Sequence, residues 1–130
     1  MVVDSSAIAA IVFLEPEAQR LTQAILAASD RLMPVANWLE VMIVVEGRLG
    51  REAANEARLI LEELQVRPLP MDIGQLHESV DAWRRYGKGR HPAALNMGDC
   101  CAYAAATSLG QELLFKGDDF ARTDVAIAAW

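Results

Sequence analysis

Acidic side chains that are distant in the sequence, each in an apolar or turn setting, are the residues most able to do chemistry in this chain. They are Asp4, Glu40, Asp99 and the adjacent pair Asp118 and Asp119. Carboxylates brought together from distant segments usually hold a hard cation such as Mg²⁺ or Mn²⁺. There is no Cys-x-x-Cys pair and no His spacing typical of a zinc site.

Asp4 directly follows the apolar pair Val2-Val3, which predicts a short buried strand. Side chains at the carboxyl ends of parallel strands face the ligand crevice of an open α/β sheet. The alternative role for Asp4 is a helix N-cap. Because Ser5 or Ser6 could serve as that cap, we expect a functional role for Asp4.

Glu40 lies in the middle of a predicted helix, inside an apolar run. An unpaired buried carboxylate is costly, so Glu40 needs a cation, an arginine partner or a water-filled cleft. Glu46 lies nearer the helix end, where it can reach solvent, and is the weaker ligand candidate.

Asp99 follows Gly98 at the start of an Ala-rich helix. An acid in the first helical turn is stabilised by the helix dipole, which explains Asp99 without function, but the same geometry can point a carboxylate into a crevice. Asp118 and Asp119 could likewise be an ordinary turn. With Asp124 five residues further on, such a concentration of acids is unfavourable unless it is solvated or bound to a cation.

The elements that must position these acids alternate between strand and helix. Expected strands are residues 2–3, 31–33, 66–69, 112–115 and 125–130. Expected helices are residues 5–14, 16–29, 35–49, 51–64, 73–86 and 98–109. This alternation predicts an α/β fold, with a mostly parallel central sheet and helices on both faces. The helix over 35–49 is apolar on nearly every side, so we expect it to be buried.

Length and composition indicate a single domain over residues 1–130, because no linker divides the chain and hydrophobic residues make up 53% of it. No apolar stretch is long enough to span a bilayer, and we expect a cytoplasmic protein without a secretory signal. The net charge of −6 argues against indiscriminate nucleic-acid binding.

A local basic patch nevertheless precedes and enters the long non-periodic stretch of residues 86–98. It contains Arg84, Arg85, Lys88, Arg90 and His91. These residues are either a solvated helix end and loop or a loop that contacts phosphates. Charge alone leaves both interpretations open.

Several motifs, taken in order, resemble a known family. They are Val3-Asp4-Ser5-Ser6-Ala7, Trp38-Leu39-Glu40, Tyr86-Gly87-Lys88-Gly89-Arg90-His91-Pro92, Leu95-Asn96-Met97-Gly98-Asp99-Cys100, and Leu113-Leu114-Phe115-Lys116-Gly117-Asp118-Asp119-Phe120 followed by Thr123-Asp124. The ordered set resembles PIN-domain ribonucleases and, more narrowly, the VapC toxins of bacterial type II toxin–antitoxin systems.

The resemblance implies a three-layer PIN-like fold and endoribonuclease activity that depends on Mg²⁺ or Mn²⁺. Its metal-binding and catalytic acids fall on Asp4, Glu40, Asp99 and a fourth position. Asp119, immediately before Phe120, is selected for the fourth, with Asp118 and Asp124 as alternatives.

The resemblance also implies RNA as substrate and inhibition by a VapB-like antitoxin. With RNA as substrate, we expect Lys88, Arg90 and Lys116 to contact its backbone. The alternatives are a nuclease of the same fold in RNA processing, without an antitoxin, and an inactive α/β interaction module. We expect a homodimer through an apolar stripe on residues 16–29 or 51–64, unless both stripes are simply core faces.

Overall fold

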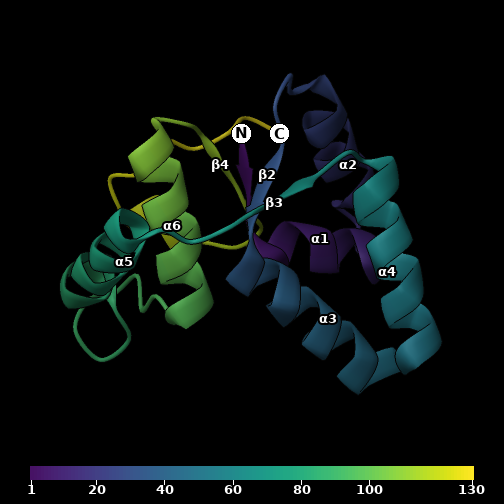
Figure 1. The fold of residues 1–130 in the computed structure, drawn as a ribbon, viewed down its shortest axis with the longest axis horizontal. Helices are drawn as coiled ribbons and strands as arrows, with labels where there is room; N and C mark the ends of the chain where they lie inside the picture. The colour runs from purple at the N-terminus through teal and green to yellow at the C-terminus, as the bar shows by residue number, and fades with distance from the viewer.

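Four short parallel strands form a central sheet that separates two groups of helices (Figure 1). The computed structural model describes residues 1–130. The elements in chain order are β1 (Val2–Val3), α1 (Ser5–Val12), α2 (Ala18–Ala27), β2 (Leu32–Pro34), α3 (Val35–Leu49), α4 (Arg51–Glu63), β3 (Arg67–Leu69), α5 (Ile73–Tyr86), α6 (Met97–Leu109), β4 (Leu113–Leu114) and a 3₁₀ turn (Phe120–Arg122). The prediction of a three-layer α/β fold is confirmed.

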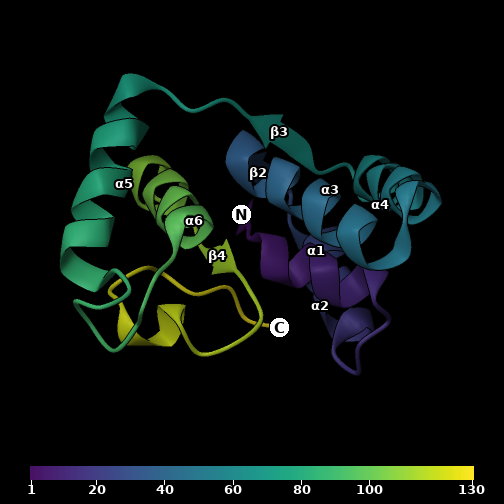
Figure 2. The same ribbon diagram turned by 90° about the horizontal axis from the view of Figure 1, so that it is seen from below.

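The strand order is β3-β2-β1-β4, so the chain first builds the sheet outward from β1 and then returns to its other side. Helices α1 to α4 lie on one side of the sheet, and α5 and α6 lie on the other (Figure 2). Strands are added on one side of β1 first and on its other side afterwards, so a topological switch point lies between β1 and β4. Open α/β sheets bind their ligands at such points. Asp4 and Asp119 both follow strands that border this point.

Side chains alternate across the sheet and supply a separate core to each layer. Val3 and Leu114 pack into the cluster under α1 to α4, whereas Val2 and Leu113 pack against α6. All four side chains are fully buried. The two-residue strands β1 and β4 are thus fixed from both sides, which holds the segments that follow them in place.

The predicted helices over 35–49 and 73–86 are confirmed at both ends, and Gly110 ends α6 in the left-handed conformation that its position predicted. The predicted strand over 125–130 is wrong. Only Ile127 forms a bridge there, to Leu113. The segment is rich in alanine, which has low strand propensity.

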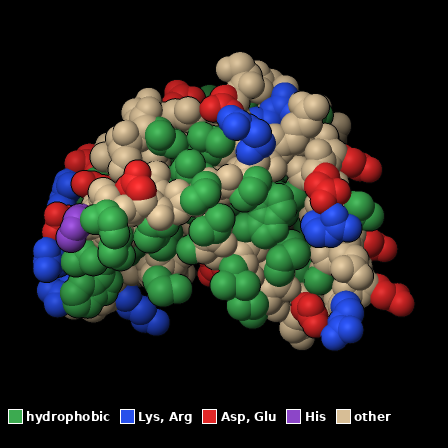
Figure 3. Space-filling model, in the orientation of Figure 1, with side chains coloured by type: hydrophobic (Ala, Val, Ile, Leu, Met, Phe, Trp, Pro, Cys, Tyr) green, Lys and Arg blue, Asp and Glu red, His purple; other side chains and the backbone are tan.

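The expectation that α3 is buried on all sides is wrong. Val41 and Val45 face the core, but Leu39 is 60% exposed and Ile43 is 62% exposed. Other exposed large apolar side chains occur on α5 and at the start of α6, including Ile73, Leu76, Trp83 and Met97. Figure 3 shows hydrophobic side chains gathered across this face of the molecule. Among the helices, none combines the length and apolar character needed to cross a membrane.

Candidate active site

Asp4 ends β1 and is almost fully buried, with 1% of its surface exposed. Its Oδ2 accepts hydrogen bonds from the Ser6 amide (2.9 Å) and the Ser6 hydroxyl (2.6 Å), and its Oδ1 accepts one from Asn37 Nδ2 (2.9 Å). Asp4 is therefore the N-cap of α1, and the expectation that Ser5 or Ser6 caps this helix is wrong. Burial raises the pKa of Asp4, against the hydrogen bonds from Ser6.

Glu40 lies on the same side of the sheet and is half-buried on α3. Its Oε2 accepts a hydrogen bond from the Ser5 hydroxyl at 2.7 Å. The carboxylate passes directly over Gly98, where a Cβ atom would lie 3.2 Å from Glu40 Cδ and closer still to Oε2. Only glycine at position 98 leaves this path open for Glu40.

Asp99 is the third residue of α6 and belongs to a capping box with Asn96. The Asp99 amide donates to Asn96 Oδ1 (2.9 Å), and the Asn96 amide donates to Asp99 Oδ2 (2.8 Å). Burial raises the pKa of Asp99 to about 6, against the Asn96 hydrogen bond, and the charges of Asp4, Asp119 and Glu40 raise it further. Asp99 is thus both a helix-terminal acid and a member of an interacting group of carboxylates.

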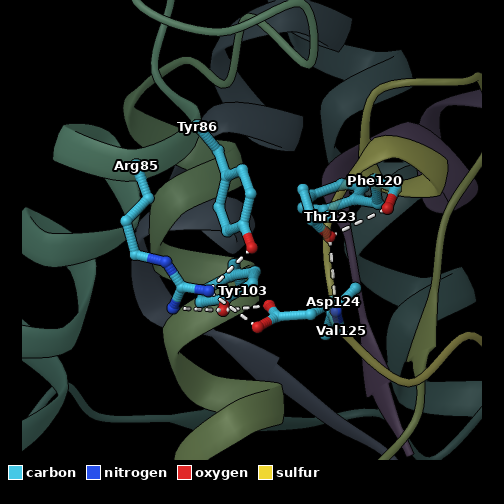
Figure 4. Close-up of polar contacts among 7 residues, drawn as sticks. All are labelled: Arg85, Tyr86, Tyr103, Phe120, Thr123, Asp124 and Val125. Atoms are coloured by element: carbon cyan, nitrogen blue, oxygen red, sulfur yellow. Dashed lines mark hydrogen bonds and ion pairs between the residues drawn. The ribbon is translucent and has the colours of Figure 1, made fainter.

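The three candidates for the fourth acid occupy different surroundings. Asp119 lines the same cavity as the other acids, whereas Asp118 is exposed in the turn before it. Asp124 accepts hydrogen bonds from the Tyr103 hydroxyl (2.6 Å) and from Arg85 Nη2 (2.7 Å), as Figure 4 shows. These two donors, the Tyr103 hydroxyl first, lower the pKa of Asp124 to about 2. The structure therefore brings Asp119 toward the other carboxylates and commits Asp124 to a contact between α5, α6 and the C-terminal segment.

One cavity of about 250 Å³ collects these groups. The residues that line it are Asp4, Ser5, Ser6, Ala9, Glu40, Val41, Val44, Asn96, Asp99 and Asp119. The four carboxylates offer only oxygen ligands, which suits Mg²⁺ or Mn²⁺ better than zinc. No three acidic, His or Cys side chains are already close enough together to hold an ion. Mg²⁺ usually binds one or two carboxylates and keeps several waters, so the donor set still fits it.

The three predicted RNA contacts differ in how free their charges are. Lys88 is exposed beside an apolar cavity of about 530 Å³ that Trp83 also lines. The guanidinium of Arg90 lies 4.0 Å from the centroid of the Trp83 ring. The ammonium of Lys116 pairs with Glu15 and, at 3.1 Å, with Glu17. Lys88 and Arg90 are thus presented at the surface without an acidic partner, whereas the charge of Lys116 is largely neutralised.

The sequence analysis missed two asparagines that support the acids. Asn96 is the N-cap of α6, and Asn37 is a fully buried partner of Asp4. Asn37 lies three residues before Glu40, and residues at this spacing share a helix face. A polar residue in an otherwise apolar helix, on the same face as a candidate ligand, is the signal that could have identified it.

Comparisons with known proteins identify one family. Residues 1–126 match the model of the PIN domain. The chain is 43% identical over 129 residues to ribonuclease VapC30 of Mycobacterium tuberculosis, covering 99% of this chain and 98% of that one. It is 46% identical over 126 residues to ribonuclease VapC of Mycolicibacterium smegmatis, covering 97% and 98%.

Two solved structures have a similar fold at lower sequence identity. One is VapC20 of Mycobacterium tuberculosis, described as a toxin that cleaves the sarcin-ricin loop. Its TM-score is 0.78 at 17% identity, covering 96% of this chain and 95% of that one. The other is a toxin–antitoxin complex from Klebsiella pneumoniae, with a TM-score of 0.75 at 17% identity, covering 97% and 94%.

Proposed function

The chain belongs to the PIN-domain family, and from that premise we propose that it is a metal-dependent endoribonuclease, the toxin of a VapBC-type toxin–antitoxin pair. The observation that carries this proposal is that four carboxylates line one cavity at the switch point of the sheet. They come from the end of β1, from α3, from the first turn of α6 and from the turn after β4.

Asp4, Asp99, Glu40 and Asp119 are the residues that would hold Mg²⁺ or Mn²⁺. When bound, such an ion lowers the pKa of a water molecule and stabilises charge on the scissile phosphate. Asp4 and Asp99 are buried and hydrogen-bonded, so they are suited to a fixed ligand role. Glu40 uses Oε2 to accept from Ser5, which leaves Oε1 to orient the attacking water.

Electrostatics give a reason for the metal requirement. The cavity carries four acids, and the whole chain has a net charge of −6, so an RNA phosphate is repelled without a compensating cation. The exposed charges of Lys88 and Arg90 are the groups best placed to attract the RNA backbone. Trp83, which is 42% exposed, lies beside them and holds the Arg90 guanidinium against its ring, 4.0 Å from the centroid.

The proposed partners are an RNA substrate, a VapB-like antitoxin and a second copy of the chain. Exposed apolar side chains on α3 and α5 support a protein partner, because large apolar patches on small proteins usually mark interaction sites. The stripes predicted for self-association mostly face the core: Leu21 and Ile25 on α2 and Leu61 on α4 are fully buried. Light scattering of the purified toxin at micromolar concentration should show a dimer, and monomer alone would contradict self-association.

The test of the function is cleavage of total RNA by protein purified free of antitoxin. We expect cleavage with Mg²⁺ or Mn²⁺, none in EDTA, and none by Asp4→Asn or Asp119→Asn. The matched control is Asp118→Asn, which removes the neighbouring exposed acid and should leave cleavage intact. Cleavage that persists in EDTA and is unaffected by Asp4→Asn would refute the proposal.

A further inference from the structure

Asn37 is a fully buried polar side chain in a helix whose other buried residues are apolar. Its Oδ1 is buried and has no hydrogen-bond partner. A buried polar atom without a partner destabilises the folded state, and an apolar residue of similar size would avoid that penalty. Packing therefore does not explain why an asparagine occupies this position.

The amide nitrogen of Asn37 makes two contacts that explain it better. Nδ2 donates to Asp4 Oδ1 at 2.9 Å and to the carbonyl oxygen of Gly98 at 3.1 Å. The carbonyl oxygen of Gly98 can only accept, so the amide group must face it with its nitrogen. The carbonyl of Gly98 immediately precedes Asp99, so one side chain ties the end of β1 to the first turn of α6.

We propose that Asn37 is a positioning residue that sets the direction of the Asp4 carboxylate and its spacing from Asp99, an inference that rests on the proposed metal-dependent function. A carboxylate offers about four acceptor sites. Ser6 fills both sites on Oδ2 of Asp4, and Asn37 fills one on Oδ1. Oδ1 is the less occupied oxygen of Asp4, so Asn37 would hold in place the atom that Asp4 would offer to a bound cation.

The test compares Asn37→Ala and Asn37→Asp with the wild-type protein. Asn37→Ala frees the Asp4 carboxylate to rotate, and Asn37→Asp places an acceptor where Asp4 and Gly98 need a donor. Loss of a hydrogen bond that orients a metal ligand typically weakens metal binding about 10- to 100-fold. Titration calorimetry with Mn²⁺ should show a loss in this range for both variants, and RNA cleavage should fall in parallel.

A matched control separates positioning from general stability. Ser79 is also buried and polar, and its hydroxyl donates to the Gln75 carbonyl at 2.8 Å within α5, away from the acidic cavity. Ser79→Ala removes this buried hydrogen bond and should leave the dissociation constant for Mn²⁺ unchanged. A folded Asn37→Ala variant that binds Mn²⁺ with wild-type affinity would overturn the inference and leave the proposed function standing.

A measurement on the wild-type protein covers the case in which the Asn37 variants do not fold. The side-chain amide resonances of Asn37 should shift when Mg²⁺ is titrated in, at the same concentrations as the backbone signal of Asp4. Resonances of Asn37 that stay fixed while those of Asp4 move would overturn the positioning role. A wild-type protein that binds neither Mn²⁺ nor Mg²⁺ would instead overturn the proposed function, and this inference with it.

Discussion

Gly98 is a position where activity and stability should separate when a single methyl group is added. In Gly98→Ala the new Cβ would overlap Glu40 Oε2, lie 3.2 Å from Glu40 Cδ and lie 3.3 Å from Asn96 Oδ1. Because Oε2 is the end of a flexible side chain, the Glu40 carboxylate should move rather than the backbone. Restoring ordinary contact requires a shift on the order of 1 Å, which breaks the hydrogen bond from Ser5.

Gly98→Ala should affect the stability of the protein much less than its rate of RNA cleavage. Alanine is favoured over glycine in a helix by up to about 1 kcal/mol, and the lost hydrogen bond costs about 1 kcal/mol. The free energy of unfolding of Gly98→Ala should therefore stay within about 1 kcal/mol of the wild-type value. A misplacement of about 1 Å at a reacting group can cost on the order of 100-fold in rate, or about 2.7 kcal/mol of barrier. The cleavage rate is thus expected to change far more than the stability.

The matched control is Gly47→Ala on α3, where an added Cβ would meet nothing within 4 Å. This variant should gain about 0.5–1 kcal/mol in stability and cleave RNA at the wild-type rate. Urea unfolding in EDTA measures the stabilities, and single-turnover cleavage with Mg²⁺ measures the rates. Gly98→Ala that cleaves at the wild-type rate would refute the argument. A loss of several kcal/mol in stability would show that the backbone, rather than Glu40, absorbs the clash.

Asp99 and Asp124 should give opposite dependences of stability on pH, and Arg90 should affect RNA binding without affecting metal binding. Asp99 has a folded-state pKa raised from 3.8 to about 6, so its contribution to stability is full below pH 3.8 and is lost as pH rises through about 6. Thermal melting in EDTA should show this loss of stability in the wild-type protein, and the Asp99→Asn variant should not show it. Asp124 has a folded-state pKa lowered from 3.8 to about 2, so its contribution to stability is present above pH 3.8 and disappears as pH falls toward 2. Thermal melting at acidic pH should show this loss in the wild-type protein and not in the Asp124→Asn variant. Arg90→Ala should weaken RNA binding and reduce its salt dependence without changing Mn²⁺ affinity, and binding measured over a salt series would contradict this if the slope stayed at the wild-type value.

The strand–helix order and the ends of α3 and α5 were predictable because they depend on local patterns, whereas α1 ends at Val12 instead of residue 14 and α2 spans Ala18–Ala27 instead of residues 16–29. Gly110, for example, signals the end of α6. The position of Asp4 at the carboxyl end of a strand could also be predicted, because it directly follows the apolar pair Val2-Val3, and the carboxyl ends of parallel strands lie along one edge of the sheet. These features depend on a few neighbouring residues, which the sequence displays directly.

The failures involve choices that only tertiary contacts decide. Three consecutive residues, Asp4, Ser5 and Ser6, can all cap a helix, and the exit direction of β1 selects Asp4. The apolar character of α3 could not reveal that Leu39 and Ile43 have no covering element within the chain. Asn37 has no partner near it in the sequence, because both groups that it contacts come from other segments.

The site resolves a conflict between bringing acids together and keeping the protein folded. Asp4 caps α1 and Asp99 lies in the first turn of α6, so two helix dipoles stabilise the charges that repel each other. These two buried acids are fixed by their hydrogen bonds, whereas Glu40 is half-buried and Asp119 is exposed. Under the proposed function, the buried pair would define where a cation binds, and Glu40 and Asp119 would complete its surroundings. The repulsion that remains is visible at Asp99, where the charges of Asp4, Asp119 and Glu40 add to burial in raising the pKa, and a bound cation would relieve it.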